Sequence, residues 1–280
     1  MTGANSKDQI CLNPDCPDYR KRNTGNIIKK GFNAKGNQMF KCKTCGVRFP
    51  ETKGTVFYNR HLKEEQIIPI CKLLVEKNGI RAIERIMEIH RDTVSNVVGD
   101  LARHAREVTE FLIKNVGLTE VQVDEMWSFV KKQKKVDAGD GDADGHGDCW
   151  IYIAKKADTK LHLAHSTGKR VQATADKLME TVRKRGKKPT EDKKATFISD
   201  GNDQYVNAIL DNFEAETINY GQLIKEREKG RVVGKTRMVI FGDVDEAGID
   251  TVYVARYNLT SRETWDFEAG WSGKVCALNF

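Results

Sequence analysis

Proline and long apolar runs are both scarce in this sequence. Only 5 of its 280 residues are proline, and no apolar run approaches the roughly 18–20 residues that a membrane-spanning helix needs. The first ten residues also lack the apolar segment of a secretory signal. With 39% hydrophobic and 31% charged residues, we expect a folded cytoplasmic protein without a membrane partner.

The excess of basic charge is confined to the first 60 residues. That segment holds 12 Lys and Arg against 4 Asp and Glu, whereas residues 61–116 hold 9 of each and residues 117–280 hold 26 against 27. A local basic excess indicates a polyanionic partner such as nucleic acid. A solvated basic surface is the alternative, and charge alone does not decide between them.

Four of the seven cysteines form two closely spaced pairs. CLNPDC has the spacing C-x4-C and CKTC the spacing C-x2-C, and the segment between them has turn residues flanked by strand-like runs. That pattern predicts a hairpin, which brings the two pairs together. Four unrelated cysteines are the weaker alternative, because paired spacing joined by a hairpin seldom arises by chance. We predict a zinc ribbon over residues 1–58 in which four thiolates hold a structural Zn²⁺: Cys11, Cys16, Cys42 and Cys45.

Residues 59–116 have the apolar spacing of helices. A helix is expected over 64–78, followed by a short helix, a turn near His90 and a longer helix capped by Asp92 and Thr93. This order predicts a helix-turn-helix, whose second helix could enter the major groove of DNA. Any three-helix bundle shows similar stripes, and the neighbouring basic segment favours DNA binding. The candidate DNA contacts are Arg91, Ser95 and Asn96.

Residues 117–280 predict a mixed α/β domain with two carboxylates at selected places. Three strand-like runs, a helix-compatible segment and a further strand follow one another, which is the opening order of the ribonuclease H-like fold. Asp124 interrupts the first strand, and Asp200 ends the last one before a Gly turn. A solvated edge acid and a turn Asp are the separate alternatives. Together the two acids favour a Mg²⁺ or Mn²⁺ site of the kind that catalyses phosphoryl transfer.

The order of these segments resembles transposases of bacterial and archaeal insertion sequences, of the insertion-sequence-one type. The resemblance covers nearly the whole chain through residue 262, and its pieces are the four-cysteine ribbon followed by ETKGTVFY, the helix-turn-helix, VDEMWSFV, GDCWIYIA, SDGNDQY, YGQLIK and YVARYNLTSR. It implies a ribonuclease H-like domain that cleaves and joins DNA with three acids, the first two being Asp124 and Asp200. It also implies a nucleoid-associated protein that acts as a homo-oligomer on double-stranded DNA, at the element ends and at the target.

The chain departs from that family at the third acid and in its tail. The family has a Glu in a stretch resembling YVERxNLT, and Ala255 stands at that position. Alanine cannot bind a cation, so we expect impaired catalysis. The other polar residues of this segment, Arg256, Asn258 and Arg262, remain available for DNA contacts. After about residue 262 the sequence becomes acidic and Trp-rich, and we hypothesise a frameshift there.

Three functions follow from these observations. The first is DNA transposition with impaired cleavage and strand transfer. The second is a non-catalytic, sequence-specific DNA-binding protein, either a repressor of transposition or a degenerate remnant, which Ala255 and the altered tail favour. A metal-dependent nuclease is the third, and it leaves the N-terminal modules unexplained.

Overall fold

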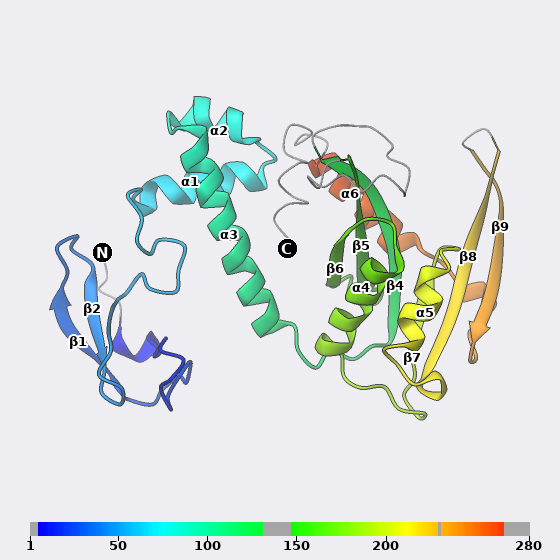
Figure 1. Ribbon diagram of the computed structural model, residues 1–280, viewed down its shortest axis with the longest axis horizontal. Helices are drawn as coiled ribbons and strands as arrows, with labels where there is room; N and C mark the ends of the chain where they lie inside the picture. The colour runs from blue at the N-terminus through cyan, green and yellow to red at the C-terminus, as the bar shows by residue number, and fades with distance from the viewer. Residues whose placement is uncertain (1–4, 131–146, 229–230, 266–280) are drawn as a thin grey trace. The chain divides into compact units, whose positions relative to one another are not determined.

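The computed structural model describes residues 5–130, 147–228 and 231–265 and divides into two compact units, residues 1–104 and 105–280 (Figure 1). The division falls within the long helix α3 (Arg91–Leu112). Among the described residues, no helix has both the length and the apolar character needed to cross a membrane.

The first unit begins with a small antiparallel sheet. Strands β1 (Ile27–Phe32) and β2 (Gln38–Cys42) form the predicted hairpin, and β3 (Arg48–Pro50) pairs with β2. The turn between β1 and β2 closes on Asn33, whose side-chain oxygen accepts hydrogen bonds from two backbone N–H groups, at 3.0 and 2.9 Å. Below this sheet the buried core is small: Cys11, Cys16, Ile27, Phe40, Cys42 and Phe49.

Three helices complete the first unit. Helices α1 (Glu64–Val75), α2 (Ile80–Met87) and α3 pack around a core of six buried side chains. The predicted cap at Asp92 and Thr93 is wrong, because α3 begins at Arg91. The His90 carbonyl oxygen accepts the first backbone hydrogen bonds of the helix, and His90 Nδ1 accepts one from the Asp92 N–H at 3.2 Å. The buried side chains are Ile67, Ile70, Ile83, Ile89, Val94 and Val97.

The second unit is built on a six-stranded mixed sheet with the order β6-β5-β4-β7-β8-β9. Strand β4 lies parallel to β7, and β7 lies parallel to β8, while the other neighbours are antiparallel. The three strands, helix and further strand expected from the sequence are all present. The elements are β4 (Glu120–Val130), β5 (Gly147–Lys156), β6 (His162–Gly168), α4 (Gln172–Arg185), β7 (Ala195–Ser199), α5 (Gln204–Leu210), β8 (Ile218–Glu228), β9 (Arg231–Phe241) and α6 (Val252–Trp265).

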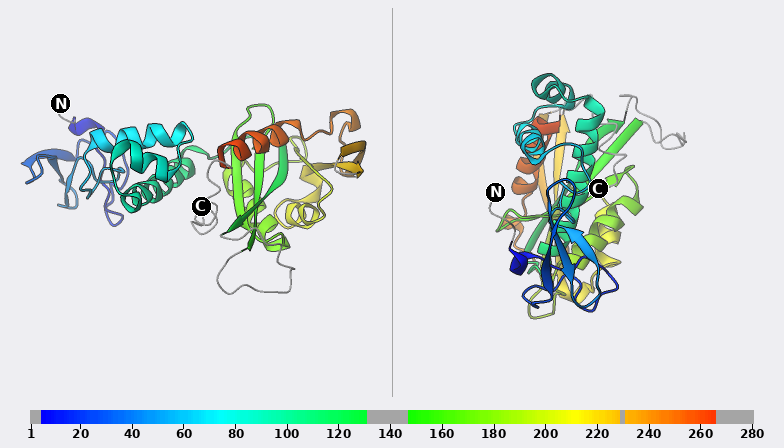
Figure 2. Two further views of the ribbon diagram at one scale, coloured as in Figure 1. Left: turned by 90° about the horizontal axis from the view of Figure 1, so that it is seen from above. Right: turned by 90° about the vertical axis from the view of Figure 1, so that its left-hand side faces the viewer.

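Helices cover both faces of this sheet (Figure 2, left). Helices α4 and α5 pack on one face over the largest apolar core of the described residues, which includes Val121 and Val123 of β4. Helix α6 lies on the other face, where Val254 packs against Met126. Because side chains alternate along a strand, odd-numbered residues of β4 face α4 and α5, and even-numbered residues face α6. This alternation decides where each acid of β4 points.

Candidate metal centres

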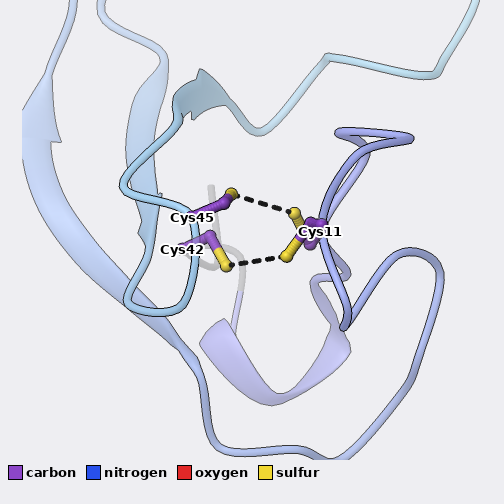
Figure 3. Close-up of side chains that lie close together, drawn as sticks. Cys11, Cys42 and Cys45 are labelled. Carbon is purple, nitrogen blue, oxygen red and sulfur yellow. Dashed lines mark hydrogen bonds between the residues drawn. The ribbon is translucent and has the colours of Figure 1, made fainter.

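The four N-terminal cysteines come together in one cluster. Cys11 Sγ lies 3.6 Å from Cys45 Sγ, and Cys16 Sγ lies 3.9 Å from Cys42 Sγ. All four sulfurs lie within 4.8 Å of one another. Figure 3 shows Cys42 and Cys45, which flank one tight loop, directed at the segment that carries Cys11. The paired spacing and the hairpin therefore produce the predicted cluster.

The cysteine cluster fits a tetrahedral Zn²⁺. Zn–S bonds of about 2.3 Å place neighbouring sulfurs about 3.8 Å apart, close to the two separations found here. Two N–H groups support the sulfurs: Asp18 N donates to Cys16 Sγ at 3.4 Å, and Asn26 Nδ2 donates to Cys42 Sγ at 3.5 Å. Burial raises the pKa of Cys11 to about 12. A cation would relieve this penalty, since only the thiolate binds metal.

Asp124 and Asp200 lie together at the end of strand β7. Strand β4 pairs with β7 only as far as Gln122 opposite Ile198, so the sheet opens between the two strands beyond that pair. Asp124 stands at the start of this opening, and Asp200 is the first residue after β7. Their carboxylate oxygens lie within 4.8 Å of each other and of a Glu125 oxygen. The two acids selected from the sequence thus form one site.

Glu125 was not selected from the sequence, and it is the most heavily bonded acid of this cluster. Its side chain is 3% exposed. Its Oε1 accepts hydrogen bonds from Arg170 Nη2 at 2.5 Å, Arg170 Nε at 3.1 Å and Asn202 Nδ2 at 3.1 Å. Its Oε2 accepts one from Tyr205 OH at 3.0 Å. The sequence signal for Glu125 was its position next to Asp124 in the same strand. Its hydrogen-bond donors come from distant segments of the chain, so the signal did not reveal its role.

The bonds of Glu125 hold the loop that carries Asp200. Asn202 donates its side-chain amide to Glu125 and its backbone N–H to Asp200 Oδ1, the latter at 3.2 Å. Glu125 points to the α4 and α5 face, whereas Asp124 points to the α6 face. Because Arg170 pairs with the Glu125 carboxylate, which is 3% exposed, and because Glu125 accepts four hydrogen bonds, we interpret Glu125 as a positioning residue and keep Asp124 and Asp200 as the candidate cation ligands.

Thr251, the residue before helix α6, forms one stripe over the site with Ala255 and Asn258 of that helix, because the three positions follow helical spacing. Thr251 Oγ1 accepts a hydrogen bond from Lys225 Nζ at 3.2 Å. Asn258 Nδ2 donates to Asp124 Oδ2 at 2.8 Å. Ala255 lies between them on the helix and is partly exposed. A longer side chain at position 255 would therefore start close to both Lys225 and Asp124.

The DNA-contact candidates have different surroundings. Asn258 was predicted to contact DNA; in the structure it is 5% exposed and its side chain is bound to Asp124. Its burial follows from its place in the stripe that faces the sheet. Arg256 is exposed, and the side chain of Arg262 lies outside the described residues. On α3, Arg91 and Asn96 are exposed and Ser95 is partly buried.

Asp124 and Asp200 both have a raised pKa. Burial, followed by repulsion from Glu125, raises the pKa of Asp124 to about 6. Burial, followed by repulsion from Glu125 and Asp124, raises the pKa of Asp200 to about 7. Carboxylates crowded without a cation have this property, because each negative charge disfavours the next. An octahedral Mg²⁺ with bonds of about 2.1 Å places ligand oxygens about 3.0 or 4.2 Å apart, which suits this cluster.

Cation binding to this site is expected to depend steeply on pH. Both carboxyls must lose a proton before they bind, so the affinity for Mn²⁺ should rise roughly a hundredfold between about pH 5.5 and pH 7.5 and then level off. Without a cation, the folding stability has the opposite pH dependence to the cation affinity. A raised pKa in the folded state favours that state at low pH, and this contribution is lost as the pH rises through about 6 to 7. Calorimetric Mn²⁺ titrations across this range measure the effect, and a flat profile would contradict it.

A scan against protein-family models matches no family, and a search of curated proteins finds no matching relative.

Proposed function

We propose that this chain is a transposase-type DNA recombination protein whose cleavage and strand-transfer activity is impaired. The observation that carries the proposal is the placement of Asp124 on β4 and of Asp200 directly after the neighbouring parallel strand β7, with α6 lying over the Asp124 strand. The strand order of the sheet through β8 supports a ribonuclease H-like domain. The resemblance to insertion-sequence transposases supplies the reaction.

The chemistry of the two ligands supports phosphoryl transfer. Divalent cations held by carboxylates stabilise the charge that develops on a phosphodiester and on its attacking and leaving oxygens. Asp124 and Asp200 would hold Mg²⁺ or Mn²⁺, and Glu125 with Asn202 keeps the Asp200 loop in register with β4. Lys225 adds a positive charge near Asp124, suited to a DNA phosphate.

The first unit would bind the element ends. Its basic excess lies in the proposed zinc ribbon, and α2 and α3 form the proposed helix-turn-helix, with Arg91 and Asn96 exposed at the start of α3. Phosphate contacts from such a surface make binding fall steeply with salt. The partner is therefore double-stranded DNA, and strand transfer between two ends calls for more than one copy of the chain.

Ala255 supports the second candidate function, a DNA-binding protein without catalysis. The position expected for the third acid carries a methyl group, and the neighbouring Asn258 occupies an oxygen of Asp124. A protein of this kind could bind element ends and block transposition.

A single substitution, Ala255→Glu, tests the proposal. The assay uses a labelled duplex that carries the DNA flanking the coding sequence, with Mg²⁺ or Mn²⁺, and measures 3′-end nicking and joining. We expect the unchanged chain to bind this duplex and to nick it slowly. Restoring the carboxylate should raise nicking by about a hundredfold, since each tenfold corresponds to about 1.4 kcal/mol of transition-state stabilisation.

Asp200→Asn is the matched control, because it removes a ligand and should abolish nicking in either background. Full nicking and joining by the unchanged chain would contradict the proposed impairment. Binding without nicking, even after Ala255→Glu, would select the non-catalytic DNA-binding protein. Failure to bind any duplex would contradict both functions.

A further inference from the structure

Asn258 has a buried amide oxygen to which no described residue donates a hydrogen bond. The residue is 5% exposed, and its Oδ1 makes no hydrogen bond among the described residues. Buried polar atoms nearly always have a partner, and an unpartnered one indicates a missing ion or water. The nitrogen of the same amide donates to Asp124, so this group belongs to the acidic site.

The geometry places Asn258 Oδ1 within reach of a cation on Asp124. Asn258 Nδ2 lies 2.8 Å from Asp124 Oδ2. The two terminal atoms of an amide are about 2.3 Å apart, so Oδ1 lies within about 5 Å of that carboxylate oxygen. Turning the amide over about its Cβ–Cγ bond exchanges its nitrogen and oxygen and directs Oδ1 at the Asp124 side of the site, and carbonyl oxygens are accepted ligands for Mg²⁺ and Mn²⁺.

The charge of the site suits one divalent cation. Asp124 and Asp200 supply two negative charges, while the charge of Glu125 is matched by Arg170 at 2.5 Å. Lys225 lies on the α6 side, where its Nζ donates to Thr251, and its positive charge opposes a second cation. With alanine at position 255, the neutral amide of Asn258 about one helical turn later offers an oxygen beside Asp124.

We propose that Asn258 Oδ1 is the third protein ligand of a single divalent-cation site formed with Asp124 and Asp200. The inference rests on the cation of the proposed function and adds a ligand to it. Without a cation, the Nδ2–H group of the amide donates a hydrogen bond to Asp124 instead. Cation binding therefore exchanges that hydrogen bond for a bond from the amide oxygen.

Titration of the full chain with Mn²⁺ alone, at about pH 7.5, tests the ligand without any DNA. We expect Asn258→Ala to weaken Mn²⁺ binding at least tenfold, and Asn258→Asp to retain or tighten it, because a carboxylate oxygen replaces the amide oxygen. The matched control is Asn212→Ala, since Asn212 bonds the Ala208 carbonyl at 2.9 Å and Arg183 Nε at 3.3 Å, and neither partner belongs to the acidic site. Its Mn²⁺ affinity should not change.

A crystal structure of the unchanged chain with Mn²⁺ decides the matter even if Asn258→Ala fails to fold. One Mn²⁺ with Oδ1 at about 2.2 Å supports the proposal. An Oδ1 farther than about 3 Å, two bound ions, or unchanged affinity in Asn258→Ala would overturn it and leave the proposed function standing. Absence of Mn²⁺ binding to the unchanged chain would overturn both.

Discussion

Replacing Cys42 with serine is expected to remove zinc and to unfold the small sheet of the first unit. Half of the six buried side chains in that sheet's core are cysteines, and the remaining Ile27, Phe40 and Phe49 are too few to stabilise a fold of this size. In small zinc domains the free energy of metal binding is the free energy of folding. Loss of one thiolate should weaken zinc binding by about a hundredfold or more.

Zinc content and amide NMR spectra of the full chain measure this effect. The unchanged chain should contain one zinc per chain, and Cys42→Ser should contain much less and lose the dispersed signals of β1 and β2. Cys71→Ser is the control, because Cys71 is a partly buried member of the helical core and not of the four-sulfur cluster. The second unit should stay folded in both variants. Full zinc content in Cys42→Ser would rule out the four-thiolate site.

The features that the sequence predicted correctly are those fixed by local pattern. Spacing within each cysteine pair and the turn residues around Asn33 predicted the hairpin and the cluster. Asp124 interrupts the alternation of apolar and polar residues in its strand, and Asp200 ends another strand just before Gly201. These two positions predicted two carboxylates that lie close together in the sheet. Each prediction needs only a few neighbouring residues and a general rule of strand geometry.

The features that the sequence did not reveal depend on contacts between distant residues. Glu125 gains its role from Arg170, Asn202 and Tyr205, which lie 45, 77 and 80 positions away. Asn258 was expected to face DNA, but its partner Asp124 lies 134 positions away. Helical spacing shows which residues share a face of a helix. Which face is buried is known only once the packing of the helix on the sheet is known.

Glu125→Ala is expected to lower the free energy of unfolding of the second unit by about 2–4 kcal/mol. The carboxylate is 3% exposed and accepts four hydrogen bonds. Asn202 and Tyr205 are buried and would lose their acceptor, whereas Arg170, whose side chain is 47% exposed, would be solvated by water. Glu125→Gln keeps the volume and one acceptor, so its cost should be about 1–3 kcal/mol. Urea unfolding followed by tryptophan fluorescence measures both changes.

The control for this loss is an ion pair on the surface of the same unit. Glu214 Oε1 lies 2.8 Å from Lys188 Nζ, and its side chain is 62% exposed. Glu214→Ala should change the stability by about 0.5 kcal/mol or less, because water screens and replaces such a pair. A positioning role for Glu125 predicts one more effect: Glu125→Gln should weaken Mn²⁺ binding because Asn202 no longer fixes the Asp200 loop, whereas Glu214→Ala should not. A loss below about 1 kcal/mol in Glu125→Ala, with Mn²⁺ affinity intact, would show that the loop of Asp200 holds its place without Glu125.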